Sequence, residues 1–504
     1  MNESRLTTNN SRYLIIGGVA LCLILFCVHI ILYRNFFIDD AYITFRYVRQ
    51  FTAGNGIVYN IGERVEGYSN FLWLLLLAPF HRLGFEIVST SKILGILLAL
   101  GTLFVTWRFG KRFGHPLIAP LLLVCSGPFV IWTMGGLETH LFTLLLVLAT
   151  YTFTKENDNQ RGFLSAVWFG LLALTRPEGI LFAGIAALFR AWQLWRNKQR
   201  PSRQDWLRAG ILAAIFGGYL LWRYSYYGNF LPNTIYAKSM GLHPRGFIEG
   251  AFYVYQTTLQ LGGVFFIIFP IAFALLDDER DTAVSYLFLN VSIYFLFMFI
   301  SGGDWMPLLR FSVHILPLIY LLVAAGLTSI VRRWPDKPVQ ILVGILVAAQ
   351  MLFLLMASME QFLVEGEGRT IHTLKENNQQ IDYLLAQVQP GDTVALTQAG
   401  KYAYYLPLDV RIVDMVGLND AHISHLPPQF PNGLTGNGDV FGKWDAAYVL
   451  AQEPDIVEVM GAYQNEANVW STAFTGTTVL LNNPQFEELF TRTEFGFFER
   501  IADE

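Results

Sequence analysis

The sequence predicts an α-helical membrane protein that crosses the bilayer about eleven times and ends in a smaller mixed α/β domain. Composition gives the first indication, because 53% of the 504 residues are hydrophobic and 15% are charged, against about a quarter charged in soluble domains. Long apolar runs then recur up to residue 357, whereas the polar remainder holds none of spanning length. We therefore expect a transmembrane domain over 1–357 and a soluble domain over 358–504.

The apolar runs follow one another with polar loops between them. The first run lacks a small-residue cleavage site, which favours a retained helix over a signal peptide. With the N-terminus in the cytoplasm, the basic loops at 108–112 and 196–203 fall on the cytoplasmic side, and an odd number of crossings places the C-terminal domain outside. The expected spans lie near 13–33, 87–107, 116–132, 137–153, 163–174, 180–192, 206–221, 262–276, 283–300, 311–331 and 339–356.

Two of the expected outer loops are long. The first outer loop, 35–86, contains an apolar stretch at 71–80 that is too short to cross a bilayer. We expect this stretch to form a helix in the membrane interface, capped by Ser69 and Asn70. The second long loop follows the seventh span and runs through Arg245.

The C-terminal stretch has the pattern of a mixed α/β fold. Residues 371–388 are typical of an amphipathic helix, and 393–396 and 410–413 are typical of strands. Turns are expected at 391–392, 418–420 and 432–438. A stretch of about 145 residues is long enough to form its own core.

Several classes of function receive no support. The formal net charge of −4 gives no indication of nucleic-acid binding. The three cysteines lie in apolar spans, as small buried hydrophobes do. His422 and His425 lack neighbouring ligands at metal-binding spacing and are expected in a surface turn. No glycine-rich nucleotide loop is recognisable.

The strongest candidate for chemistry is Asp39-Asp40, directly after the first span. Charge at a membrane boundary is costly and usually functional. A carboxylate there can accept a proton from a sugar hydroxyl that attacks a donor. The alternative is that one of the two acids caps a helix over 41–51. Adjacent side chains point in different directions, so we expect one carboxylate to face the site and the other to be held by a partner.

Cations in the outer loops are candidates for binding a phosphate. Arginine offers a two-pronged fork to phosphate and lysine a point charge. The alternative is that these side chains reach toward lipid headgroups, and that the aromatic residues of the same loops form an interfacial belt. The cations are Arg176, Lys238 and Arg310, with Arg46 and Arg64 in the first loop.

Several separated motifs resemble one family, the mycobacterial terminal β-(1→2)-arabinofuranosyltransferase and its relatives. The similar segments follow the same order along the chain, and a weaker similarity continues in the C-terminal domain at 412–418. The membrane segments are 37–47, 62–73, 175–179, 229–234 with Lys238, and 302–307 with Arg310.

The resemblance implies a GT-C type glycosyltransferase, an enzyme that takes a sugar from a polyprenyl phosphate at the outer leaflet. It also implies that Asp39 or Asp40 is the base, that arabinofuranose is the sugar, and that the C-terminal domain binds carbohydrate or guides the acceptor. Some GT-C enzymes use a divalent metal ion and others do not; Glu138 and Asp304 are candidates to support one. The further candidates for substrate contacts are Arg46, Arg64, Glu66, Tyr68, Asn70, Glu138, Asn233, Asp304 and Trp305.

The sequence thus predicts a transferase of the bacterial inner membrane with its site on the periplasmic side. The donor would be decaprenyl- or undecaprenyl-phospho-arabinose. The acceptor would be an envelope glycan, lipopolysaccharide or a pilin-like protein. Two alternatives are a transporter or flippase of a lipid-linked sugar, whose helices usually show inverted repeats, and a non-catalytic subunit of an envelope assembly complex.

Overall fold

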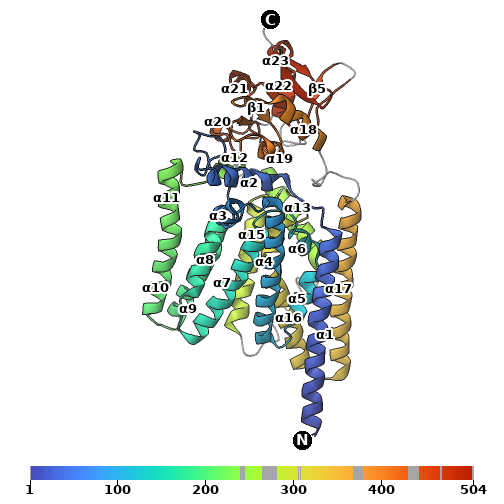
Figure 1. Cartoon of the computed structure of the whole chain (residues 1–504). Coiled ribbons are helices and arrows are strands. Elements are labelled where there is room, and N and C mark those ends of the chain that lie inside the picture. The colour runs from blue at the N-terminus through green and yellow to red at the C-terminus, as the bar shows by residue number, and fades with distance from the viewer. Residues whose placement is uncertain are drawn as a thin grey trace. The chain divides into compact units, whose positions relative to one another are not determined.

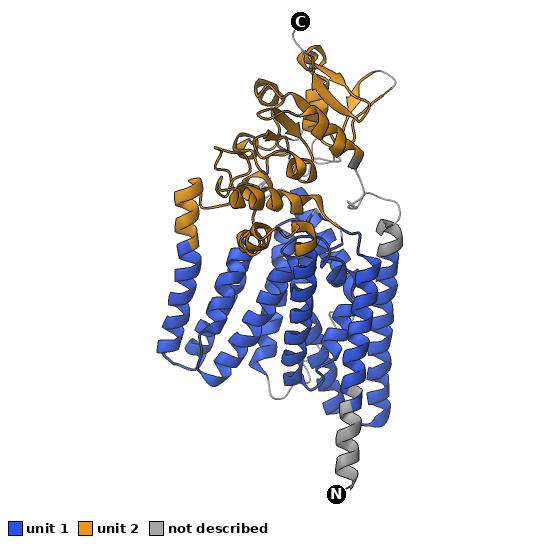
Figure 2. Ribbon diagram, viewed as in Figure 1, with its two compact units in different colours: residues 1–36, 91–218, 244–371 blue, residues 37–90, 219–243, 372–504 orange. Residues whose placement is uncertain are grey.

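The structure is a computed structural model of the whole chain, and it describes residues 2–238, 244–263, 281–304, 306, 308–366, 378–429, 442–465 and 468–501. Most of the expected span near 262–276, the expected turn at 432–438 and Trp305 lie outside these residues. The chain divides into two compact units (Figure 2). Unit 1 comprises 1–36, 91–218 and 244–371, and unit 2 comprises 37–90, 219–243 and 372–504.

Unit 1 consists of helices that lie side by side (Figure 1). Among the described residues, five helices are long and apolar enough to cross a membrane: α1, α4 with η1, α15, α16 and α17. The predicted class, a multi-pass helical membrane protein, is confirmed, while the number of crossings stays a prediction. The helices are α1 Asn2–Leu32, α4 Ile87–Gly110, η1 Lys111–Phe113, α5 Ile118–Cys125, α6 Gly127–Ile131, α7 Thr139–Asn159, α8 Leu164–Thr175, α9 Gly179–Arg196, α10 Arg203–Leu212, η2 Ala213–Gly217, α13 Pro244–Leu261, α15 Thr282–Ile300, α16 Arg310–Arg333 and α17 Lys337–Gly366.

Helix α16 is the buried centre of unit 1. Of its apolar window 94% is buried, compared with 17% for α1 and 22% for α17. An apolar helix that exposes most of its surface suits contact with lipid, whereas one that is buried all round is packed by protein. Unit 1 is therefore organised around α16, with α1 and α17 exposed.

The sequence ended the second long loop near Arg245 and assigned no element to 246–261, where the structure has most of α13. Its buried residues, Gly250, Tyr253, Thr257 and Leu261, recur at helical spacing. Polar residues between them hide this pattern from a search for continuous apolar runs. A methyl group on Gly250 would lie 2.0 Å from the carbonyl oxygen of Phe299, so glycine allows α13 to pack closely on α15.

Unit 2 combines the first outer loop, a short central segment and the C-terminal stretch. Its helices are α2 Asp39–Thr52, α3 Phe71–Arg82, α11 Gly218–Tyr227, α12 Asn233–Lys238, α18 Asn378–Gln387, α19 Lys401–Tyr405, α20 Ala421–His425, α21 Ala446–Ala451, α22 Thr475–Leu481 and α23 Pro484–Leu489. Its strands are β1 Thr393–Leu396, β2 Arg411–Asp414, β3 Ile456–Glu458, β4 Tyr463–Gln464, β5 Trp470–Ser471, β6 Phe490–Arg492 and β7 Phe497–Arg500.

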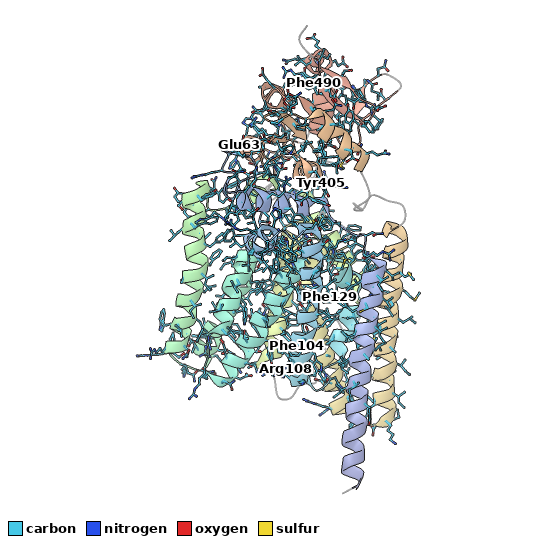
Figure 3. The ribbon with its side chains drawn as sticks, in the orientation of Figure 1. Glu63, Phe104, Arg108, Phe129, Tyr405 and Phe490 are labelled. Carbon is cyan, nitrogen blue, oxygen red and sulfur yellow. The ribbon has the colours of Figure 1, made fainter. Side chains whose placement is uncertain are left out.

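The main sheet of unit 2 has the strand order β2-β1-β3-β7-β6. β1 is parallel to β2 and β3, while β7 is antiparallel to β3 and β6. Helices pack on the sheet around a core that includes Val413, Val457 and Phe490, the last of which is labelled in Figure 3. The predicted strand at 393–396 is confirmed, and the one predicted at 410–413 lies one residue later.

Two local predictions about the first loop have mixed outcomes. The short apolar stretch does form a helix, α3, but the side chain of Asn70 makes no capping hydrogen bond there. Its Oδ1 instead accepts a hydrogen bond from Thr44 Oγ1 at 3.1 Å. The predicted side-chain cap at Asn70 is therefore wrong, because a tertiary partner on α2 takes its acceptor.

Candidate active site

The acidic pair lies in the first turn of α2. The helix begins at Asp39, and its N-cap residue is Ile38, which has no side-chain oxygen. Neither carboxylate caps this helix, so the capping alternative from the sequence is wrong. Negative charge in a first turn is favourable because it faces the positive end of the helix dipole. Both aspartates are half-buried.

Asp39 is held by the loop that precedes α19. Lys401 N donates to Asp39 Oδ1 at 2.8 Å, and Gly400 N donates to Asp39 Oδ2 at 3.1 Å. A methyl group on Gly400 would lie 2.2 Å from Asp39 Oδ2, so only glycine fits this contact. Both oxygens of Asp39 are therefore bound to backbone, which makes Asp39 an anchor for α2.

Aromatic rings strengthen the same contact. The ring of Tyr42 lies 5.2 Å from that of Tyr404 and 6.1 Å from that of Tyr405, which is labelled in Figure 3. Phe45, one turn further along α2, lies 6.1 Å from Tyr404. Of these pairs, the one between Phe45 and Tyr404 is edge-on and the other two are tilted; aromatic pairs add about 1 kcal/mol each beyond their buried area. Helix α2 is thus fixed against α19 on two sides of its first turns.

Arg46 lies fully buried behind the pair. Its Nε donates to the carbonyl of Tyr59 at 3.0 Å, its Nη2 to that of Val410 at 2.8 Å, and its Nη1 to that of Ala403. Burial lowers the pKa of Arg46 to about 10. A guanidinium that satisfies three carbonyls inside a core positions the backbone around it. Arg46 thus joins the first loop to the C-terminal stretch.

Glu66 forms a buried ion pair that the sequence did not reveal. Arg223 Nε lies 2.9 Å from Glu66 Oε2, and the hydroxyl of Tyr219 donates to Glu66 Oε1 at 3.2 Å. Burial raises the pKa of Glu66 to about 7, and Arg223 opposes this shift. The only signal in the sequence was a lone arginine within an aromatic helix. The pair fastens α11 to the first loop.

Asn233 joins two of the motifs. Its Nδ2 donates to the carbonyls of Gly417, Leu418 and Asp420 at 3.1, 2.9 and 3.2 Å, and its Oδ1 accepts from Ser424 Oγ at 2.7 Å. All these partners belong to the C-terminal stretch, which had shown only a weak similarity. The central motif and the C-terminal motif are therefore neighbours within unit 2.

The remaining predicted residues of unit 2 are spread over its surface and core. Tyr68 is buried, with its hydroxyl 3.1 Å from that of Tyr227. The guanidinium of Arg64 lies 4.8 Å from the ring centre of Tyr226. Arg411 Nε donates at 2.7 Å to Glu63, which is labelled in Figure 3. Lys238 is exposed at the end of α12.

Unit 1 gathers its own charged group at one end of its helices. Arg176, just after α8, pairs with Glu138 and Glu178, and all three side chains are buried. Arg310, at the start of α16, donates to Asp304 through Nε at 2.7 Å and Nη2 at 3.3 Å. The guanidinium carbons of both arginines lie 5.3 and 5.5 Å from the ring centre of Phe311. The structure thus brings two of the three predicted phosphate-binding cations together.

A second layer of ion pairs lies at the other end of α7. Arg112 pairs with Asp158 and Asp281, and Arg208 pairs with Glu156. Helix α7 has 21 residues, which corresponds to a length of about 30 Å. This is the thickness of a hydrocarbon core. The two charged layers of unit 1 therefore have the spacing of two membrane surfaces.

Among the described residues, no three His, Cys, Asp or Glu side chains gather as a group that could hold a metal ion. His422 lies 3.0 Å from Asp445 and stacks on Tyr448 at 4.1 Å. This histidine is therefore engaged in a local surface contact.

The fold defines the class of protein to which the chain is similar. Solved structures of ArnT from Cupriavidus metallidurans match it with a TM-score of 0.56 for the form bound to undecaprenyl phosphate, at 11% identity over 79% of this chain and 85% of that chain. The apo form matches with a TM-score of 0.54 at 12% identity, over 80% and 86%. The chain therefore has the GT-C fold of ArnT.

Sequence comparison then points to particular relatives. The chain is 29% identical over 233 residues to the terminal β-(1→2)-arabinofuranosyltransferase of Mycobacterium tuberculosis, covering 41% of this chain and 35% of that protein. The corresponding protein of Corynebacterium glutamicum is 30% identical over 240 residues, covering 41% and 33%. The predicted resemblance is confirmed, although the chain spans about a third of the length of these relatives. Residues 369–495 match a family described as a domain of unknown function, DUF8728.

Proposed function

We propose that this protein is a membrane glycosyltransferase that moves arabinofuranose from a polyprenyl-phosphate donor to an acceptor hydroxyl outside the cytoplasm. The observation that carries the proposal is the binding of Asp39 by Gly400 and Lys401, because it fixes the first turn of α2 and with it a second carboxylate, Asp40. The GT-C fold and the names of the two relatives support the same reaction class.

Asp40 is the proposed base, and Asp39 is the positioning residue. Asp40 accepts the proton of the acceptor hydroxyl as the acceptor oxygen bonds to the anomeric carbon of the donor sugar. The bond from that carbon to the phosphate oxygen breaks, and its electron pair leaves with the polyprenyl phosphate. A base held on a fixed helix turn needs little rearrangement before reaction.

The donor phosphate is proposed to bind cations from the set Arg176, Arg310 and Lys238. Arg176 is paired with two carboxylates and Arg310 with one. Arg310 therefore keeps the greater capacity to accept a further anion. A guanidinium can bind carboxylate and phosphate oxygens at once through its separate N–H groups.

The other predicted substrate contacts fall into groups with different proposed roles. Arg64, Tyr68 and Trp305 stay proposed substrate contacts. Arg46, Glu66, Asn70 and Asn233 are proposed to position unit 2, and Glu138 and Asp304 to orient the arginines of unit 1.

The proposed location is the bacterial inner membrane, with about eleven crossings and the C-terminal domain on the periplasmic side. Basic side chains cluster beside the ion-pair layer of Arg112, Glu156 and Asp158, at 108–112, 196–203 and 332–337. The positive-inside rule assigns that layer to the cytoplasm. The layer of Arg176 and Arg310 then faces the periplasm, where a lipid-linked donor and an envelope glycan, lipopolysaccharide or pilin-like acceptor are both accessible.

The comparisons do not favour a transporter or a non-catalytic subunit. Both curated relatives are named as transferases, and ArnT shares the fold. No contact among the residues that the structure describes favours either alternative.

The proposal is tested with the purified full-length chain in lipid nanodiscs. The donor is polyprenyl-phosphate carrying radiolabelled arabinose, and the acceptors are arabinan oligosaccharide, lipopolysaccharide and a pilin. Transfer of label to one acceptor, with release of polyprenyl phosphate, is expected. Absence of transfer from both decaprenyl and undecaprenyl donors, with folded protein, would overturn the proposal.

A further inference from the structure

The C-terminal stretch contains a cavity that the proposed reaction has not used. Its volume is about 430 Å³, within the range of small-molecule sites, roughly 300–1,000 Å³. The segment after β1, the end of β3 and the β6–β7 hairpin form its walls. The lining includes Gln380, Gln398, Tyr402, Glu458, Arg492 and Phe497.

Glu458 is a buried carboxylate, and one of its two oxygens already accepts three hydrogen bonds from the protein. Its Oε2 accepts hydrogen bonds from Thr397 N at 2.9 Å, Thr397 Oγ1 at 2.7 Å and Gln398 N at 3.0 Å. Its Oε1 accepts no hydrogen bond from the residues that the structure describes, and it is not one of their fully buried atoms, so it is open to the cavity. A hydroxyl group that enters the cavity can donate a hydrogen bond to this oxygen.

The rest of the lining suits a neutral, hydroxyl-rich ligand. The hydroxyl of Tyr402 donates to Gln380 Oε1 at 2.8 Å, and Gln398 Nε2 lies 3.0 Å from Met460 Sδ. Amides offer both donors and acceptors, and the rings of Tyr402 and Phe497 can contact the C–H face of a sugar. Two carboxylates, Glu458 and Glu494, against one guanidinium disfavour a phosphate or another anion.

The cavity shares one short segment with the acidic pair. Thr397 and Gln398 bind Glu458, whereas Gly400 and Lys401 bind Asp39. Gln398 and Gly400 are two positions apart, so their Cα atoms lie within about 8 Å of each other. A ligand in the cavity is therefore held by the same segment that fixes the first turn of α2.

We propose that this cavity is a glycan subsite, in which Glu458 accepts a hydroxyl of a sugar residue of the acceptor chain. The statement that this sugar belongs to the acceptor rests on the proposed transferase function. The statement that the cavity binds a sugar is independent of that function. A sugar-binding subsite for the acceptor favours a glycan acceptor over an unglycosylated protein.

The test measures binding directly. Fluorescein-labelled linear arabinofuranose hexasaccharide and maltohexaose are titrated with the full-length chain in nanodiscs, and fluorescence polarisation is recorded. Wild type should bind one or both saturably. Glu458→Gln, which retains an acceptor for the Thr397 segment and turns an amide toward the ligand, should weaken binding at least tenfold. Glu488→Gln, on exposed α23, is the matched control and should bind like wild type.

A second variant keeps the proposal testable if Glu458→Gln does not fold. Gln398→Leu fills the cavity from its other wall and leaves the backbone N–H that binds Glu458 in place. If wild type binds neither sugar, or if both Glu458→Gln and Gln398→Leu bind as wild type does, the subsite is overturned.

Transfer kinetics separate this proposal from the proposed function. Glu458→Gln should raise the KM for the acceptor about tenfold and change kcat less than threefold, whereas Asp40→Asn should bind the hexasaccharide normally. If wild type binds sugar but transfers nothing from any donor, the transferase proposal fails and the subsite stands. If wild type transfers and Glu458→Gln leaves the acceptor KM unchanged, the subsite fails and the transferase stands.

Discussion

Gly400 and Asp39, 361 positions apart in the sequence, are joined by a hydrogen bond of 3.1 Å from the Gly400 amide to the Asp39 carboxylate. The contact leaves no room for a side chain at Gly400. Asp39 is thereby fastened to the C-terminal stretch, and the same helix turn carries Asp40.

Gly400→Ala should destabilise unit 2. The new methyl group would lie 2.2 Å from Asp39 Oδ2 and must displace it, at a cost of about 1–3 kcal/mol for overpacking. A lower melting temperature in detergent and slower sugar transfer are expected together. Gly246→Ala is the control, because no atom lies within 4 Å of the added methyl there; equal melting of wild type and Gly400→Ala would contradict the contact.

Asn233→Asp should be strongly destabilising although the two side chains have the same shape. Three backbone carbonyls would face a carboxylate in place of an amide donor, a loss on the order of 3 kcal/mol. Asn229→Asp in the same motif is exposed and should melt like wild type. Similar melting of the two variants would show that Asn233 does not hold the C-terminal motif.

Arg176→Met should destabilise unit 1 by about 3–5 kcal/mol, because it removes the guanidinium with which the buried Glu138 and Glu178 both pair. Adding Glu138→Gln and Glu178→Gln neutralises the two carboxylates and should recover part of the loss. Chemical denaturation in detergent measures both steps. If the triple variant is no more stable than Arg176→Met alone, the buried pairing is not the cause.

Glu66→Gln should flatten the dependence of stability on pH. Burial raises the pKa of Glu66 from 4.5 to about 7 in the folded protein. Between these values the folded chain keeps a proton that the unfolded chain has released, so wild-type stability falls as the pH rises from about 4.5 to 7. The change is on the order of 3 kcal/mol. Melting curves at pH 5 and 7.5 should differ less for the variant, and parallel behaviour would contradict the assignment.

Local patterns in the sequence predicted the helices and strands better than they predicted the contacts between them. Continuous apolar runs predicted helices such as α16, and a short, mainly apolar run predicted β1, because these signals lie within one element. Helix α13 was missed because Gln256, Thr258 and Gln260 interrupt its apolar residues. The partners of Asp39, Glu66 and Asn233 come from distant segments. No local pattern specifies such partners, so the sequence could not decide which aspartate is anchored.

The most direct test of the account compares Asp40→Asn with Asp39→Asn in the transfer assay, with melting temperature measured on the same samples. Asp40→Asn should stay folded and lose transfer by at least a hundredfold, in line with removal of a general base. Asp39→Asn should lower the melting temperature, because one oxygen acceptor is replaced by an amide that opposes a backbone N–H, and should keep measurable transfer. Full transfer by Asp40→Asn, or complete loss confined to a stably folded Asp39→Asn, would contradict the assignment of Asp40 as the base.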